Sequence, residues 1–126
     1  DDRGGTLRGG NTIRVFTADG ISVAHLGDLG HPLSAEQLAA IGPVDAALVP
    51  VGGVYTLDAA GAKSVCDALK PRCVLPMHYR HAPYGLAEVS GVEPFLALWP
   101  QAEVHRLSGP AVELTKAVSG VLVPQF

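Results

Sequence analysis

A glycine-rich stretch that carries an aspartate and two histidines is the first candidate for chemistry in this sequence. Residues 24–31 read A-H-L-G-D-L-G-H, so Asp28 lies between two glycines, with His25 and His31 on either side. The apolar run before this stretch would place Asp28 on a tight turn just past a strand. Such a turn lets a ligand approach the backbone and holds a carboxylate at the mouth of a sheet. An aspartate between glycines is also common in ordinary turns, so both interpretations stay open.

Two further apolar runs end in turns with unusual residues. The run D-A-A-L-V-P-V at 45–51 is followed by G-G-V-Y, and the run R-C-V-L-P at 72–76 is followed by M-H-Y-R-H. Short apolar runs between turn residues are typical of buried parallel strands, whose carboxyl ends meet at one sheet edge. We therefore expect Asp28, the glycine pair and His78 to lie close together. A carboxylate and an imidazole at such an edge suit a divalent metal such as zinc, iron or manganese.

The hydrophobic pattern predicts the strands that would position these side chains. An Asp-Gly pair at 19–20 predicts a two-residue hairpin in which Phe16 pairs with Val23. Both faces of this hairpin are mainly apolar, so we expect layers on both sides, as in an α/β domain. The expected strands cover residues 12–18, 21–26, 45–51, 72–76, 102–107 and 112–115, with 120–126 as a last strand or an ordered tail.

Capping signals predict three helices between these strands. Ser34 and Gln37 have the spacing of a capping box, and Gly42-Pro43 would end that short helix. Asp58 is a favourable N-cap for the longest helix, which Pro71 would stop. A second capping box at 90–93 predicts a short helix that extends to about Trp99 and packs Phe95 in the core. His105, on a late strand, is expected at the surface.

Composition limits the class of protein. The chain has 126 residues, 48% of them hydrophobic, which is enough for one packed domain at most. The net charge is −3 and no basic run occurs, so we expect no nucleic acid or membrane partner. No apolar stretch approaches the roughly 20 residues of a membrane helix. Cys66 and Cys73 lack C-x-x-C spacing, which favours buried free thiols in the cytoplasm over a disulfide or a metal site.

The first ten residues of the chain resemble a loop within a larger domain. Met77 is the only methionine, and the opening D-D-R-G-G-T-L-R-G-G is hydrophilic and rich in glycine. It has no signal-peptide pattern. We therefore expect the chain to be part of a longer protein.

Three motifs together resemble a known family. H-L-G-D-L-G-H, V-D-A-A-L-V-P-V-G-G-V-Y-T-L-D and L-K-P-R-C-V-L-P-M-H-Y look like the C-terminal half of a metallo-β-lactamase-fold hydrolase. The branch that they resemble is that of the ascorbate-6-phosphate lactonase-like, Zn-dependent hydrolases. The resemblance runs from Asp1 to about Arg80 and is loose beyond it. It implies an α/β fold: the C-terminal half of an αββα sandwich, with a mixed sheet and helices packed on it. Residues 1–126 would form a single partial domain, and residues 1–11 a loop.

The resemblance also implies a metal centre. In the family, the aspartate of the G-D pair bridges two metals, which corresponds to Asp28, and the histidine after the late strand binds the second metal, which corresponds to His78. The opening D-D-R-G-G-T-L-R-G-x-N-T matches the segment that follows another metal-binding histidine. The expected metals are two zinc ions, with manganese or iron as alternatives. Water activated between metals roughly 3.5–4 Å apart would attack an ester, lactone, phosphodiester or amide.

Four other residues are candidates for contacts with a small-molecule substrate. Gly53 and Tyr55 could shape the pocket, and the Tyr55 hydroxyl could donate to a developing oxyanion. His31 could face the substrate or support a ligand, and Arg80 could hold an anionic group. Three of them have an ordinary structural alternative: a core position for Tyr55, a capping or solvated position near the helix start for His31, and a solvated loop for Arg80. His78 could likewise be a hydrogen-bonded histidine at the end of a strand.

One large departure from the family limits what this chain can do alone. The signature H-x-H-x-D-H lies in the family's N-terminal half and does not occur in this sequence. Two ligands rarely hold a catalytic zinc ion. We therefore predict a metal-dependent hydrolase that needs the missing N-terminal half, and an inactive isolated chain. The alternative is a non-catalytic half-domain that self-associates through an exposed apolar layer and serves as a binding or structural module.

Overall fold

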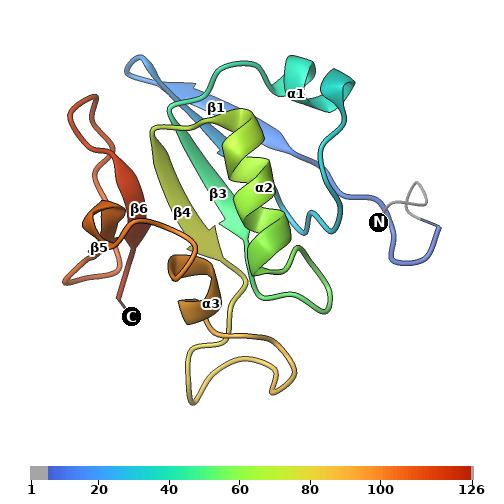
Figure 1. Cartoon of the computed structure of the whole chain (residues 1–126). Helices are drawn as coiled ribbons and strands as arrows, with labels where there is room; N and C mark the ends of the chain where they lie inside the picture. Colours follow the sequence, from blue (N-terminus) through green and yellow to red (C-terminus); the bar gives the residue numbers. More distant parts are fainter. Residues whose placement is uncertain (1–5, 126) are drawn as a thin grey trace.

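A six-stranded mixed sheet forms the body of the protein (Figure 1). The computed structural model describes residues 6–125. The strands are β1 (Arg14–Ala18), β2 (Ile21–His25), β3 (Ala46–Pro50), β4 (Cys73–Met77), β5 (Val104–Arg106) and β6 (Gly120–Val123). The helices are α1 (Ala35–Ile41), α2 (Ala59–Leu69) and α3 (Glu93–Leu96), with a 3-10 helix, η1, over Gln101–Glu103. The predicted α/β architecture is confirmed.

Three consecutive strands in the middle of the sheet are parallel and in register. The strand order is β1-β2-β3-β4-β6-β5, and among the strands of residues 6–125 only the β1–β2 pair is antiparallel. His25 of β2 pairs with Leu48 of β3, and Pro50 of β3 pairs with Met77 of β4. The residues that follow these three strands therefore emerge at one edge of the sheet, as the sequence predicts.

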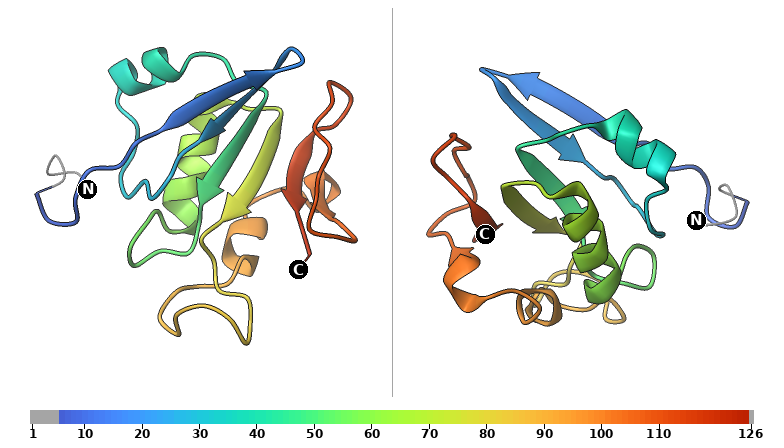
Figure 2. Two further views of the ribbon diagram at one scale, coloured as in Figure 1. Left: turned by 180° about the vertical axis from the view of Figure 1, so that it is seen from behind. Right: turned by 45° about the horizontal axis from the view of Figure 1, so that its top comes forward.

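Side chains alternate between two apolar clusters on the two faces of the sheet. On one face, α2 lies across β3 and β4, and α3 packs beside it (Figure 1). The larger cluster joins these helices to the sheet through Ala47, Val49, Val65, Val74 and Phe95, among others. The smaller cluster, on the opposite face, consists of Ala46, Cys73 and Leu122, and the segment 107–118 packs against it. Seen from behind, the strands lie in front of α2 (Figure 2).

The helix ends follow the capping signals in two of three cases. The Ser34 hydroxyl accepts from the Gln37 amide at 3.1 Å, and the Gln37 side chain accepts from the Ser34 amide at 2.9 Å, so the capping box is confirmed. Asp58 caps α2 by accepting from the Gly61 amide at 2.8 Å. The second predicted capping box is wrong, because α3 begins at Glu93 without a side-chain cap.

Two other expectations from the sequence are wrong. The hairpin has the predicted register, with Phe16 opposite Val23, but it is not covered on both sides. Every residue of β1 is exposed, because this strand is the edge of the described sheet. Phe16, for example, retains 57% of its surface. Residues 112–115 are not a strand. They lie irregularly across the sheet, where Val112 and Leu114 fill the smaller cluster.

The chain ends are only partly described. Residues 6–8 form a turn and residues 9–11 have no regular secondary structure, as the predicted loop requires, whereas residues 1–5 of that loop lie outside the described residues. β6 covers the start of the predicted final strand, and Phe126 also lies outside the described part. None of the helices within residues 6–125 has the length and apolar character needed to cross a bilayer.

The two cysteines are buried free thiols, as expected. Burial raises the pKa of the Cys66 thiol to about 12. Burial also raises the pKa of Cys73, whose Sγ donates to the Val118 carbonyl at 3.1 Å. Both thiols therefore belong to the packing of the sheet rather than to a reactive site.

Candidate metal centre

Asp28 sits on a tight turn that continues β2. Gly27 has a φ of 60°, a conformation that glycine adopts at little cost. The Gly27 amide donates to His25 Nδ1 at 3.1 Å, and the Asp28 amide donates to Asn11 Oδ1 at 2.9 Å. Two successive amides of the turn, those of Gly27 and Asp28, are therefore held by side chains. The Asp28 side chain itself is 72% exposed.

His78 follows the last residue of β4 in an unusual backbone conformation. Its φ is 55°, in the left-handed region that non-glycine residues seldom occupy. Its carbonyl lies directly against Gly52, where an added Cβ would meet the His78 oxygen at 2.1 Å. The neighbouring segments are tied by hydrogen bonds from the Ser90 amide to the Gly52 carbonyl and from the Arg80 amide to the Ser90 carbonyl, both 2.9 Å. Strained residues that the surrounding structure fixes in place are concentrated at functional sites.

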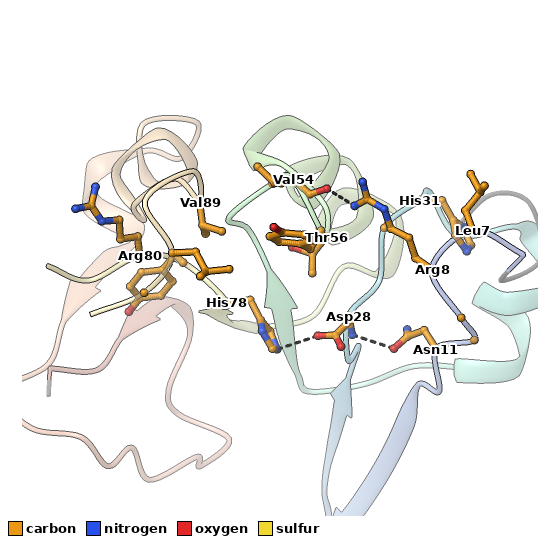
Figure 3. A pocket seen from close by; sticks show the side chains of 18 of the residues that line it. Leu7, Arg8, Asn11, Asp28, His31, Val54, Thr56, His78, Arg80 and Val89 are labelled. Carbon is orange, nitrogen blue, oxygen red and sulfur yellow. Dashed lines mark hydrogen bonds and ion pairs between the residues drawn. The ribbon is translucent and has the colours of Figure 1, made fainter. Parts of the chain in front are cut away.

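The side chains of Asp28 and His78 point toward one another across the edge of the sheet (Figure 3). Asp28 Oδ1 and His78 Nε2 are 3.5 Å apart. Two donors that bind one zinc ion at about 2.0–2.1 Å lie roughly 3.3–3.4 Å apart at a tetrahedral angle. The pair therefore has the donor types and the spacing of two ligands of one metal ion. Within residues 6–125 no third His, Cys, Asp or Glu joins them to make a cluster of metal ligands.

A cavity of about 910 Å³ opens beside this pair. That volume is within the range of small-molecule sites. All six site residues predicted from the sequence line it: Asp28, His31, Gly53, Tyr55, His78 and Arg80. The structure thus brings them together, although it does not test their roles. Figure 3 shows that the Arg80 guanidinium points away from the Asp28–His78 pair, so in this conformation Arg80 contributes its aliphatic stem rather than its charge.

Tyr55 joins two loops at the rim of the cavity. Its hydroxyl donates to Glu88 Oε1 at 2.9 Å, and the Arg8 guanidinium lies 5.6 Å from the centre of its ring. The hydrogen bond to Glu88 raises the pKa of Tyr55, and the Glu88 pKa is lowered by its own backbone amide and by Tyr55. The hydroxyl hydrogen is thus already donated, and Tyr55 could stabilise an oxyanion only after the bond to Glu88 breaks.

A hydrogen bond to the backbone defines which ring nitrogen of His31 carries the proton. Its Nδ1 lies 2.7 Å from the Pro32 carbonyl oxygen, which can only accept a hydrogen bond. In the neutral imidazole the proton is therefore on Nδ1, and Nε2 carries the lone pair. His31 is half-buried in the cavity wall. Its neutral form can accept a hydrogen bond from a substrate or support a metal ligand.

Several cavity residues escaped the sequence analysis. Arg8 donates to the Val54 carbonyl and brings a positive charge to the wall, while Leu7, Val54 and Leu86 add apolar surface. Asn11 binds the Asp28 turn. The G-x-N-T segment before the hairpin was a signal for Asn11, because continuing the β1–β2 register places position 11 opposite position 28. Nothing in the local sequence indicated that Glu88 would reach Tyr55.

The family is shown by a comparison with family models. The model of the β-lactamase superfamily domain matches residues 1–78, which is more than half of the chain and ends at the candidate ligand His78. The chain therefore belongs to the family of β-lactamase superfamily domains.

Similar proteins agree with this family and with the fold. A UPF0173 metal-dependent hydrolase from Carboxydothermus hydrogenoformans is 37% identical over 75 residues, which cover 60% of this chain and 33% of that protein. One from Pyrococcus furiosus is 41% identical over 70 residues, covering 55% and 31%. A Thermotoga maritima crystal structure, proposed to be a Zn-dependent hydrolase of the metallo-β-lactamase superfamily, superposes with a TM-score of 0.80. Its sequence is 36% identical, and the match covers 90% of this chain and 62% of that one. The chain spans about a third of the length of these curated relatives.

Proposed function

We propose that this chain supplies one side of the active site of a metal-dependent hydrolase. Asp28 and His78 would be two ligands of a divalent metal centre, and the remaining ligands would come from outside residues 6–125. The observation that carries the proposal is the pair itself: Asp28 Oδ1 and His78 Nε2 are 3.5 Å apart at the open edge of the sheet. The names of the relatives as metal-dependent hydrolases support the same reaction class.

The chain's own residues would divide the work between metal binding and substrate binding. Coordination to zinc lowers the pKa of water from about 15.7 to about 7, so hydroxide would be available at neutral pH. Asp28 would hold the metal by a carboxylate oxygen and, as the expected bridging ligand, would balance its charge. His78 would bind through Nε2, the nitrogen that faces Asp28. Zinc is our preferred metal, with manganese or iron as alternatives, because mixed carboxylate and imidazole sites accept several metals.

The cavity is suited to a small molecule with an apolar part next to the scissile bond. Leu7, Val54 and Leu86 expose 65%, 50% and 55% of their surface, and all three line the cavity. The Arg8 guanidinium gives the same wall a positive charge, and His31 Nε2 can accept a hydrogen bond. We propose an ester, lactone, phosphodiester or amide as substrate, and membership of the ascorbate-6-phosphate lactonase-like branch stays part of this proposal.

The test compares two ligand variants with a nearby histidine. Asp28→Ala and His78→Ala, in the protein that carries this chain, should each lower zinc affinity and the hydrolysis of generic ester or phosphodiester substrates by more than about 100-fold. Losing a supporting residue alone commonly costs 10- to 100-fold. His81→Ala is the matched control, because His81 is an exposed imidazole three residues from His78 and does not line the cavity. Hydrolysis that survives both ligand substitutions would refute the assignment.

The isolated 126-residue chain should bind zinc weakly and should not hydrolyse these substrates. The reason is that the described residues provide only two donors at the site, whereas catalytic zinc usually has three protein ligands. Metal content after dialysis and turnover of the same substrates measure this directly. Stoichiometric zinc with turnover in the isolated chain would contradict it.

A second candidate function is self-association without catalysis. The observation that favours it is the exposed edge strand β1, on which Val15 and Phe16 retain 45% and 57% of their surface. An exposed apolar edge strand can pair with a second copy of the chain. Light scattering and metal content separate the two candidates. A stable dimer that binds no metal, and that Phe16→Lys converts to a monomer, would favour self-association over hydrolysis.

A further inference from the structure

The side chain of Asn11 makes hydrogen bonds to the Asp28 turn of the kind that a neighbouring strand would make. Asn11 Nδ2 donates to the Leu26 carbonyl at 2.9 Å. Asn11 Oδ1 accepts from the Asp28 amide at 2.9 Å, as Figure 3 shows. In the β1–β2 hairpin, Arg14 pairs with His25. Continuing that register by three residues places Asn11 opposite Asp28, just where the chain leaves the ladder. A carboxamide has the same donor and acceptor groups as a peptide, so it completes the ladder that the backbone no longer forms.

The turn has no spare room on the side that Asn11 occupies. A Cβ added to Gly27 would lie 2.3 Å from Asn11 Oδ1 and 3.2 Å from the Thr12 carbonyl oxygen. Gly27 also has a φ of 60°. The amide of Gly27 is bound by His25 Nδ1 at 3.1 Å. Three polar groups of the turn, the Leu26 carbonyl and the amides of Gly27 and Asp28, therefore each have a side-chain partner, and Asn11 supplies two of the three.

The Asp28 carboxylate itself has little to hold it. Its side chain is 72% exposed, and its described partner is His78 Nε2 at 3.5 Å, which is too long for a strong hydrogen bond. The direction of the carboxylate therefore depends on the backbone of the turn. Asn11 holds that backbone at two points, the Leu26 carbonyl and the Asp28 amide, each at 2.9 Å.

We propose that Asn11 is a positioning residue that aims the Asp28 carboxylate at the metal centre by holding the Leu26–Asp28 turn with both ends of its amide. The inference rests on the proposed function for the metal, but the clamp is a property of this chain. Loss of a residue that orients a metal ligand typically weakens metal binding by 10- to 100-fold. Because Asn11 is exposed, water can replace its hydrogen bonds, so the fold should survive its loss.

The test uses three variants of the protein that carries this chain. Asn11→Ala removes both hydrogen bonds, and Asn11→Asp keeps the acceptor for the Asp28 amide but loses the donor to the Leu26 carbonyl. Thr12→Ala is the matched control, since Thr12 is adjacent and exposed. Zinc affinity is measured by competition with a chelator, and protection of the Asp28 amide by hydrogen exchange with metal removed. We expect Asn11→Ala to lose 10- to 100-fold in affinity and to lose amide protection, Asn11→Asp to lose less of both, and Thr12→Ala to change neither.

The outcomes separate this inference from the proposed function. Unchanged zinc affinity in Asn11→Ala overturns the inference, whether or not the Asp28 amide loses protection, because the clamp would then be only structural. Equal losses in Asn11→Ala and Thr12→Ala overturn it as well. If the unsubstituted protein binds no zinc and Asp28→Ala has no effect, the proposed function fails and the inference falls with it. The hydrogen-exchange result still reports in that case whether the clamp exists.

Discussion

Substituting Gly52 by alanine should damage the candidate site through His78 without touching any side chain that could bind a metal. Gly52 is buried two residues after the end of β3, and its φ is not in the left-handed region. Alanine is therefore not excluded by backbone conformation. The obstacle is space, because the new Cβ would lie 2.1 Å from the His78 carbonyl oxygen and 2.5 Å from Val89 Cγ1.

The size of the effect follows from these distances. An ordinary contact begins near 3.4 Å, so the His78 carbonyl would have to move by about 1.3 Å. Val89 is a side chain and can rotate away, but the obstructing atom of His78 belongs to the backbone. A misplacement of about 1 Å in a site can cost roughly 100-fold in activity. Overpacking of this kind also destabilises the fold by about 1–3 kcal/mol.

The assay measures both consequences against a matched glycine. Gly30→Ala is the control, because Gly30 lines the same cavity and an added Cβ would meet only the Tyr55 carbonyl oxygen, at 3.8 Å. In Gly52→Ala we expect zinc affinity to fall by about 100-fold. We expect the thermal midpoint to fall by about 4 °C per kcal/mol lost, for a domain of this size. In Gly30→Ala the zinc affinity should stay within twofold, and the free energy of unfolding should change by no more than about 0.5 kcal/mol.

Two results would refute this reasoning. If Gly52→Ala binds zinc as tightly as the unsubstituted protein, the position of the His78 backbone does not control the site. If Gly30→Ala is equally damaging, the loss comes from crowding the cavity in general, and the contact between Gly52 and His78 explains nothing. A thermal midpoint that falls without any loss of zinc affinity would assign Gly52 to folding alone.

Two further predictions concern groups whose pKa values are shifted. Glu88→Gln should make Tyr55 ionise at lower pH, because the hydrogen bond to Glu88 raises the pKa of Tyr55. The pKa of Glu88 is lowered by its own backbone amide and by the same bond to Tyr55. The stability that this bond contributes is present above the ordinary glutamate pKa of 4.5 and below the ordinary tyrosine pKa of 10.0. It is lost as pH falls through the lowered pKa of Glu88 or rises through the raised pKa of Tyr55. Phenolate absorbance, with Tyr55→Phe to identify the signal, measures the shift, and an unchanged titration would show that the bond is absent in solution. Cys66 and Cys73 should not react with a thiol reagent near pH 8 until denaturant is added, since burial raises both pKa values; a rapidly labelled native thiol would contradict this.

The convergence of the site could be predicted from the sequence because it depends on strand order. Short apolar runs before Asp28, the glycine pair and His78 predict parallel strands, and parallel neighbours end at one edge whatever their loops do. The same argument could not reach Glu88. It lies in the loop after β4, and the position of that loop is set by hydrogen bonds of Ser90 with Gly52 and Arg80 rather than by a periodic pattern.

Ser90 illustrates why the second predicted capping box was wrong, although the short helix that it was expected to open exists as α3. Its spacing from Glu93 fits a capping box, yet its backbone amide and carbonyl are already used to tie the loop to Gly52 and Arg80. A residue bound in this way is not placed to cap a helix, and α3 begins three residues later. The expectation that layers cover both faces of the hairpin was wrong for a different reason. The apolar side chains of β1 were counted correctly, but β1 is the edge strand of the described residues, and alternation does not reveal what lies beyond an edge.

The two candidate ligands are held by different physical means, and this difference makes the site testable in two ways. Asp28 depends on hydrogen bonds between the backbone of its turn and the side chains of Asn11 and His25, and these bonds can be removed one at a time. Variants of Asn11 should therefore weaken metal binding in steps, in proportion to the bonds that remain. His78 depends on a close approach at Gly52, where the first added carbon already overlaps the His78 carbonyl oxygen. Substitutions at Gly52 should therefore act as a threshold, with alanine already causing most of the loss that larger side chains cause.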